Sequence, residues 1–183
     1  MAGEPSKGLA GVVADYTAIS TVNEETNSLL YRGYAVEELA RSRSMEETAW
    51  LLWRGELPTA QELDQLRGRL VGHSAIPEKL QTILESLPED SHPMDVTRTA
   101  LSVLGNLSPL ASRIDLEAER EIAEQLFAVL PAVVAGIQRR RMGLPPIPPR
   151  EDLTYTENFL WMSFGQEFPE VVTSAFQTSM ILY

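Results

Sequence analysis

The sequence predicts an all-α, mainly helical protein with one small β-hairpin near its N-terminus. From Ala35 onward, apolar side chains recur at helical spacing. Several of these segments start with Ser or Thr followed three residues later by Glu, the pattern of a capping box. Runs that favour β-structure are confined to the part before Arg32. With 183 residues and 44% hydrophobic content, the chain can bury a core as one domain or as a piece of a larger one.

The β-structure is expected in short runs rich in branched and aliphatic residues. These runs are Leu9–Val13, Thr17–Val22 and Leu29–Tyr31. The turn residues Arg32 and Gly33 follow the last run and close a small sheet or hairpin.

Two short helices are expected next. The first covers Ala35–Arg41, and the second begins after Ser44. Ser44 can accept from early backbone amides while Glu47 reaches back, so the pair forms a capping box. Gly55 is expected to end the second helix, because glycine readily adopts the left-handed conformation found after a helix.

Further helices follow with their own start and stop residues. Thr59 and Glu62 repeat the capping box and open a helix that runs through Leu70. The next helix begins near Pro77 and is ended by Pro88, because proline is tolerated at the start of a helix but not in its interior.

Two more helices complete the central part of the chain. One carries an apolar face from Val96 to Leu104, and the other covers Leu116–Arg141. Pro131 lies inside the second pattern and lacks the N–H that a helix uses. We therefore expect this long helix to be kinked or split at Pro131.

Residues 144–150 contain four prolines and predict an extended, semi-rigid segment. Such a segment can link two domains. Because Thr154 and Glu157 then form another capping box, and a short apolar helix leads to Gly165, we expect the segment to wrap around one helical body.

The last predicted helix starts near Phe168 and ends in the apolar run Met180–Tyr183. This run has no glycine, asparagine or basic residue to satisfy the final carbonyl groups. We expect these apolar groups to face a partner surface. The alternative is a terminal helix that docks against the rest of the same domain.

The formal net charge of −11 argues against a nucleic-acid surface, which needs clustered Lys and Arg. The basic cluster Arg139–Arg141 lies at a predicted helix end, where cations favour the helix dipole, so a structural role is expected. The sequence has no cysteine, which excludes disulfides and thiolate sites. Without a signal peptide or a membrane-spanning apolar run, we expect a soluble cytoplasmic protein with no membrane partner.

The two histidines are the natural candidates for acid–base or metal chemistry. His73 lies at a predicted helix end and fits a capping or solvent-exposed role. His92 lies near Asp90 and Asp95 and fits a polar group that orders the start of a helix. Their spacing matches no metal motif, and the chain has no Gly-x-Ser-x-Gly, Gly-x-Gly-x-x-Gly or P-loop pattern.

Four segments, taken in order and spacing, resemble the citrate synthase and 2-methylcitrate synthase family. The first runs from Gly8 through Tyr31-Arg32-Gly33-Tyr34 to Ala40, the second is Glu46–Leu52 with Gly55–Thr59, the third is His92–Val96 with Arg98–Ala100, and the fourth is Glu157–Met162 with Phe164-Gly165. Trp161 stands where a Tyr is common in the family. Together the segments span nearly the whole chain.

The resemblance implies an almost wholly helical enzyme with a large and a small domain, which works as a homodimer. Such enzymes join acetyl-CoA or propionyl-CoA to oxaloacetate and hydrolyse the resulting thioester, with no metal or bound redox cofactor. In the family an Asp removes the proton, a His donates to the thioester oxygen, and a second His and several Arg hold oxaloacetate.

In the family, these catalytic and oxaloacetate-binding residues come after the part that this chain resembles. The first of them lies in an Ala-Glu/Asp-His segment that is expected just after the position of Tyr183. We therefore expect residues 1–183 to be the N-terminal portion of the large domain, to contain no catalytic or cofactor-binding residue, and to be inactive alone. Two alternatives remain open: a non-catalytic partner that pairs with a separate C-terminal half or a full-length homologue, and a helical interaction module that has lost the reaction.

Overall fold

The computed structural model describes residues 8, 12–13 and 15–183 and confirms the predicted helical fold. A small antiparallel sheet of three strands precedes eight helices in this part of the chain. The strands are β1 (Ser20–Asn23), β2 (Ser28–Tyr31) and β3 (Tyr34–Ala35). The helices are α1 (Val36–Ser42), α2 (Met45–Arg54), α3 (Ala60–His73), α4 (Glu78–Ser86), α5 (Pro93–Leu107), α6 (Leu116–Arg141), α7 (Tyr155–Phe164) and α8 (Glu170–Leu182).

The sheet starts later in the chain than predicted. The turn at Arg32 and Gly33 is confirmed: both residues have positive φ, 51° and 89°, as a tight hairpin between β2 and β3 requires. The short strand β3 was not predicted. Val12 and Val13 are exposed and belong to no strand, so the predicted strand is wrong at these residues, and Leu9–Ala10–Gly11 lie outside the described residues.

The three predicted capping boxes are all present. Ser44, Thr59 and Thr154 each accept from the backbone of the glutamate three residues later, and each glutamate reaches back. Gly55 and Gly165 end α2 and α7 in the left-handed conformation, as predicted.

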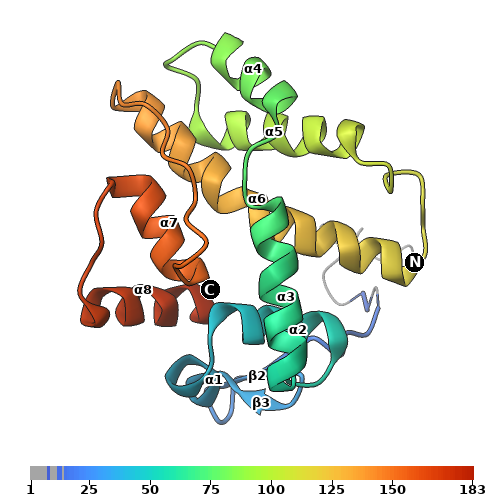
Figure 1. The fold of residues 1–183 in the computed structure, drawn as a ribbon. Helices are drawn as coiled ribbons and strands as arrows, with labels where there is room; N and C mark the ends of the chain where they lie inside the picture. Colours follow the sequence, from blue (N-terminus) through green and yellow to red (C-terminus); the bar gives the residue numbers. More distant parts are fainter. Residues whose placement is uncertain (1–7, 9–11, 14) are drawn as a thin grey trace.

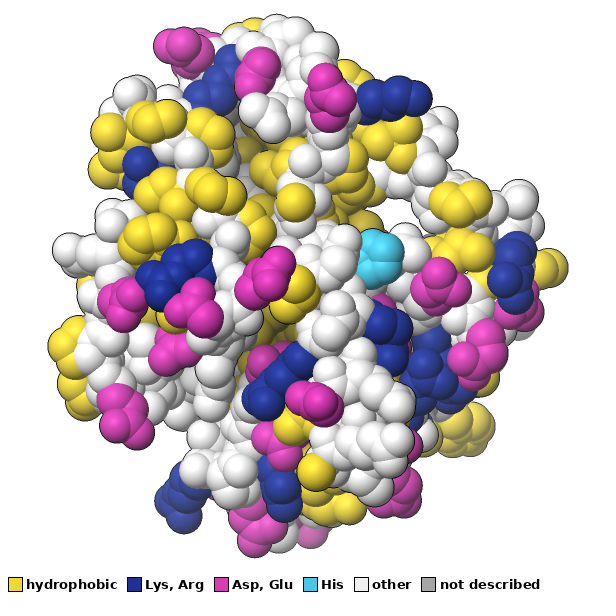
Figure 2. All heavy atoms as spheres, in the orientation of Figure 1, with side chains coloured by type: hydrophobic (Ala, Val, Ile, Leu, Met, Phe, Trp, Pro, Cys, Tyr) yellow, Lys and Arg dark blue, Asp and Glu magenta, His cyan; other side chains and the backbone are white. Residues whose placement is uncertain are grey.

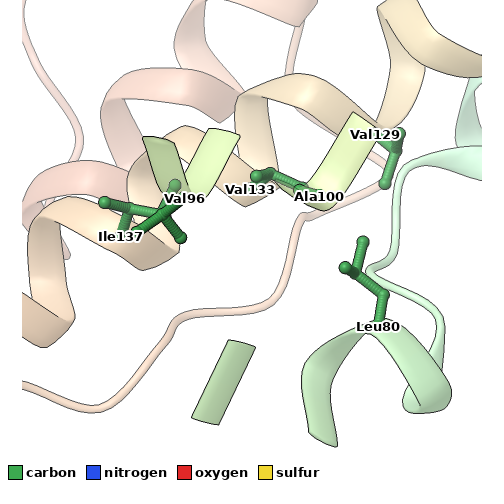
Figure 3. Close-up of a cluster of buried hydrophobic side chains, with 6 residues drawn as sticks. All are labelled: Leu80, Val96, Ala100, Val129, Val133 and Ile137. Atoms are coloured by element: carbon green, nitrogen blue, oxygen red, sulfur yellow. The ribbon is translucent and has the colours of Figure 1, made fainter. Parts of the chain in front are cut away.

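Helix α6 runs through the middle of the molecule, with α4 and α5 on one side and α3 and α7 against its other faces (Figure 1). Three of the four buried clusters include α6 residues. The largest joins α4, α5 and α6 (Figure 3), and its members are Leu80, Val96, Ala100, Val129, Val133 and Ile137. By length and composition α6 could cross a membrane, but 44% of its apolar window is buried inside this fold, where it serves as the core helix.

We expected a kink or a split at Pro131, and of these two the split is wrong, because α6 is continuous from Leu116 to Arg141. Proline cannot donate to the carbonyl of Phe127, four residues earlier. The Tyr155 hydroxyl donates to this carbonyl instead, at 3.1 Å, and the rings of Tyr155 and Phe127 stack with their centroids 4.1 Å apart. A side chain from α7 therefore replaces the hydrogen bond that α6 lacks.

Helix α8 confirms the docking alternative for part of the C-terminal run, and the expected partner surface stays a prediction. Ile181 is only 2% exposed and packs with Leu51 and other residues of the α1–α2 region, as in the docking alternative. Gln177 adds a hydrogen bond of 3.3 Å to the carbonyl of Arg43. The opposite side stays open, because Val171 is 74% and Leu182 45% exposed. The helix thus docks through one side and presents apolar groups on another.

Candidate functional site

The two histidines hold the structural positions that the sequence predicts. His92 is the N-cap of α5, and its Nδ1 accepts from the backbone N–H of Met94 at 3.2 Å. His73 is the last residue of α3 and is exposed. Within the described ranges, no group of three or more His, Asp or Glu side chains is placed to hold a metal ion.

The basic cluster at the end of α6 is used for support. Arg139 donates to the carbonyl of Pro145 at 2.6 Å, and Arg141 donates to that of Ser91 at 2.9 Å. Arg140 donates to carbonyl groups in the last turn of α4, among them Leu84. The predicted structural role is confirmed. All three arginines lie at the negative end of α6. In addition, Arg140 caps α4, and Arg139 anchors the segment after α6.

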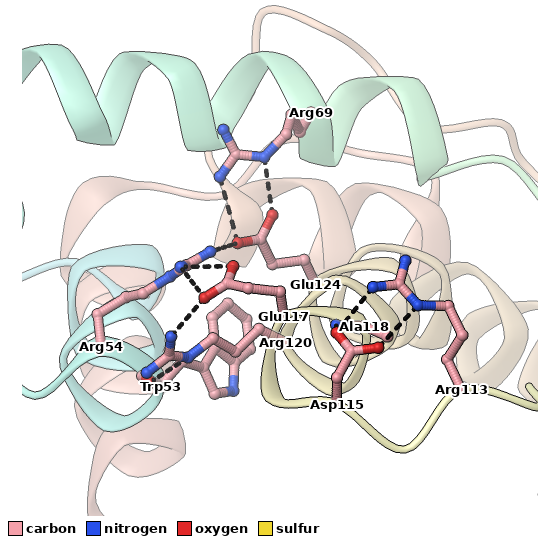
Figure 4. A network of polar contacts seen from close by, with 9 residues as sticks. All are labelled: Trp53, Arg54, Arg69, Arg113, Asp115, Glu117, Ala118, Arg120 and Glu124. Atoms are coloured by element: carbon pink, nitrogen blue, oxygen red, sulfur yellow. Dashed lines mark hydrogen bonds and ion pairs between the residues drawn. The ribbon is translucent and has the colours of Figure 1, made fainter. Parts of the chain in front are cut away.

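A network of buried charge joins α2, α3 and α6 (Figure 4). Glu124 of α6 is 5% exposed and accepts two hydrogen bonds from Arg69 of α3, at 2.7 and 3.2 Å, and one from Arg54 of α2, at 3.4 Å. Glu117, seven residues nearer the start of α6, pairs with Arg54 and with Arg120. The sequence pattern does not single out Glu124, because Glu117, Glu119 and Glu121 precede it in the same helix.

A cavity with a volume of about 460 Å³ lies between α3, α6, α7 and the proline-rich strap, which we define as residues 144–153. We call it the strap cavity. In Figure 2 the hollow between the strap and α3 has hydrophobic side chains at its floor and charged groups at its rim. The apolar part of the lining comes from Leu70, Val71, Ala75, Ala128, Pro131, Leu153 and Met162, and the polar part includes Glu46, Arg67, Ser74 and Asn158.

The strap is fixed at the rim of this cavity by polar contacts. Asn158 of α7 accepts from the backbone N–H of Arg150 at 2.9 Å, and the indole of Trp161 donates to the carbonyl of Pro148 at 3.2 Å. The Arg150 guanidinium lies over the Trp161 ring and pairs with Asp152, whose pKa it lowers through its hydrogen bonds. The strap therefore wraps one helical body, as predicted.

Two titratable side chains, Glu46 and Tyr155, are part of the cavity lining. Glu46 of α2 is 3% exposed, and its nearest basic partner is Arg67, with Nε 3.4 Å from Oε1. Tyr155 has a raised pKa, first because burial disfavours its anion and second because the Glu46 carboxylate is near. Tyr155 therefore stays protonated at neutral pH and remains a hydrogen-bond donor.

The cavity lining contains carboxylates and guanidinium groups but no histidine. Neither His73 nor His92 is among its residues, so the described structure brings neither of the sequence candidates to this cavity. The arrangement can bind a ligand. Among the described lining residues, the hydroxyl of Thr154 donates to the Glu157 carboxylate at 2.7 Å, and this pair forms the capping box of α7.

Comparison with known proteins identifies the fold. A family model described as citrate synthase, C-terminal domain, matches residues 8–183. A 2-methylcitrate synthase from Mycobacterium tuberculosis is 51% identical over 177 residues, which cover 97% of this chain and 44% of that protein. A citrate synthase from Mycolicibacterium smegmatis is also 51% identical, over 178 residues that cover 97% of this chain and 47% of that protein.

The structural comparison agrees. The crystal structure of citrate synthase from Pyrobaculum aerophilum superimposes with a TM-score of 0.88 at 31% identity, over 95% of this chain and 46% of that one. The chain thus spans less than half the length of these relatives. The chain belongs to the citrate synthase family, because the match over residues 8–183, the identity to two named synthases and the shared helical fold all agree.

Proposed function

We propose that this chain is part of a citrate synthase-type acyltransferase, which joins the acyl group of acetyl-CoA or propionyl-CoA to oxaloacetate and releases CoA. The family match over residues 8–183 is the observation that carries the proposal. Relatives named for citrate and for 2-methylcitrate are equally similar to the chain, at 51% identity, so both acyl-CoA substrates belong in the test. Discrimination between two acyl groups that differ by one methylene is worth only about 1–3 kcal/mol. It can depend on a few pocket residues that hardly change the overall sequence identity.

We propose further that residues 1–183 supply the N-terminal scaffold of the large domain, and that the catalytic Asp and His come from the part of the relatives that the chain does not span. Two observations support this. Both histidines lie at helix ends, and the strap cavity has no histidine in its lining. The chain spans 44–47% of the two named relatives, which leaves room in them for the remaining groups.

The test follows release of free CoA thiol from acetyl-CoA or propionyl-CoA in the presence of oxaloacetate. The purified chain alone is expected to show no turnover above background. When it is co-expressed with the remaining portion of the Mycobacterium tuberculosis relative, turnover is expected with at least one of the two acyl-CoA substrates. Turnover by the chain alone at the rate of a whole synthase would disprove the division of roles.

The complemented enzyme also tests the proposed chemistry. Proton abstraction by a carboxylate and hydrogen bonding by histidine need no metal or redox cofactor. We therefore expect dialysis against EDTA to leave its rate unchanged. A loss of activity that a divalent cation restores would contradict this part of the proposal.

For assembly we propose a homodimer in the cytoplasm. Light scattering of the purified, complemented protein is expected to give twice the mass of one copy. A stable mass of one copy across a range of concentrations would contradict the homodimer, and cell fractionation tests the compartment.

The second candidate is a non-catalytic subunit that pairs with a separate C-terminal half or with a full-length homologue. The exposed apolar groups of α8 favour it, because Val171 and Leu182 are large groups left in solvent. Co-purification of such a protein from native cells is expected in this case. A monodisperse chain without a partner would count against pairing and favour a helical module that has lost the reaction. Coding sequence downstream of Tyr183, whether in frame or shifted, distinguishes a divided enzyme from this module.

A further inference from the structure

We propose that the strap cavity, between α3, α6, α7 and the strap, binds a small organic cation: a primary ammonium group on an apolar body, with the ammonium at Glu46. This inference does not depend on the proposed acyltransfer, because the cavity lies wholly within the described residues and contains none of the groups proposed for that reaction.

The first argument is the incomplete pairing of Glu46. Its side chain is 4% exposed, and none of the described residues donates a hydrogen bond to Oε2. The other oxygen meets Arg67 only at 3.4 Å, whereas charge-assisted hydrogen bonds are usually about 2.7–2.9 Å. A buried carboxylate without donors is costly, so the position calls for a donor that the described chain does not supply.

The second argument is the shape and lining of the space next to Glu46. A volume of about 460 Å³ is within the usual range for small-molecule sites. Leu70, Ala128, Pro131 and Met162 form apolar walls, which suit the hydrocarbon part of a ligand. Because the terminal torsion of a glutamate is broad, the carboxylate can turn either oxygen toward the cavity.

The third argument concerns the charge of the ligand. At the rim, Arg150 is shared between Asp152 and Glu167. Among the described lining residues, Glu46 is the one with a buried side-chain oxygen that accepts no hydrogen bond, and this oxygen can accept from a cation or another donor. One carboxylate does not provide the several oxygen ligands that Mg²⁺ or Ca²⁺ requires. An ammonium with three N–H groups matches both oxygens of one carboxylate.

The experiment titrates the 183-residue chain with 2-phenylethylammonium and, separately, with neutral 2-phenylethanol, using NMR chemical shifts and calorimetry. The two probes share an apolar body and differ in charge. We expect saturable binding of the ammonium probe, and binding at least tenfold weaker for the alcohol, the loss typical of removing a hydrogen bond to a charged group.

Variants locate the site. Glu46→Gln is expected to abolish the preference for the ammonium probe, and Glu38→Gln on the exposed side of α1 is the matched control that should keep it. Arg67→Ala is expected to keep or strengthen binding, because Arg67 competes for Glu46. Val71→Trp, which fills the cavity from a position 41% exposed, should block binding without disturbing the core.

The outcomes are distinct. If the ammonium probe does not saturate, or if both probes bind equally, the proposal is wrong. The same holds if the preference survives in a folded Glu46→Gln variant. Should that variant fail to fold, Val71→Trp decides: unchanged binding there places the probe elsewhere and overturns the proposal.

Discussion

Replacing Tyr155 by Phe tests how α6 continues through Pro131. The substitution keeps the ring that stacks on Phe127 at 4.1 Å and removes only the hydroxyl, which donates at 3.1 Å to the Phe127 carbonyl. That carbonyl has no N–H partner in α6, because residue 131 is proline. Leaving a buried acceptor unpaired costs about 1–3 kcal/mol, and since this bond is only partly buried we expect about 1–1.5 kcal/mol.

The measurement is urea unfolding, followed by far-UV circular dichroism, in a double-mutant cycle with Pro131→Ala. Alanine restores the N–H at position 131, so in that background the Phe127 carbonyl keeps a partner after the hydroxyl is removed. We therefore expect Tyr155→Phe to cost about 1 kcal/mol less beside Ala than beside Pro. An equal cost in the two backgrounds would refute the idea that the hydroxyl replaces the missing backbone donor.

Three further predictions concern charge, pH and capping. Glu124→Gln is expected to lower the free energy of unfolding by about 2–3 kcal/mol, less than for a fully buried pair because its arginines reach solvent. Glu117→Gln changes a side chain that is 65% exposed, so in the same urea titration its effect should be much smaller. The fold raises the pKa of Tyr155 above its ordinary value of 10.0, so as the pH rises the unfolded chain loses this proton before the folded chain does. The free energy of unfolding should therefore stay constant with respect to this group below about pH 10 and fall above it. Measured at about pH 9 and pH 11, the fall should be smaller in Tyr155→Phe. Thr154→Ala should cost about 1 kcal/mol by thermal melting, since it removes the cap of α7, and Thr154→Ser should restore most of it.

Local signals in the sequence predicted much of the fold. A capping box is formed by residues three apart, so Ser44 and Thr59 announce α2 and α3 without knowledge of any distant contact. The same is true of Gly55, whose left-handed conformation few other residues adopt. The cap of α6 was missed, although Asp115 accepts from the N–H of Ala118 in the usual way, because no glutamate at the third position completes the box.

Features that depend on distant residues were not predicted. The hydroxyl that lets α6 pass through Pro131 comes from Tyr155, 28 positions from the carbonyl that it satisfies. Arg140 caps α4 from 53 to 56 positions away, so its helix-end position showed only part of its role. For the same reason the cavity could not be predicted, because its walls come from four separate segments.

Two arginines of α3 pair with two buried glutamates in different ways, and the difference matters for function. Arg67 and Arg69 are two positions apart on this helix and therefore point to different sides. Arg69 meets Glu124 with two short hydrogen bonds in the network that ties α3 to α6, whereas Arg67 leaves Glu46 with one long contact at the wall of a cavity. The fold can thus pair a buried glutamate fully, and it does so where two helices must be held together. At Glu46 the pairing is incomplete and empty space lies beside it, the combination that a binding site requires and a purely structural ion pair does not.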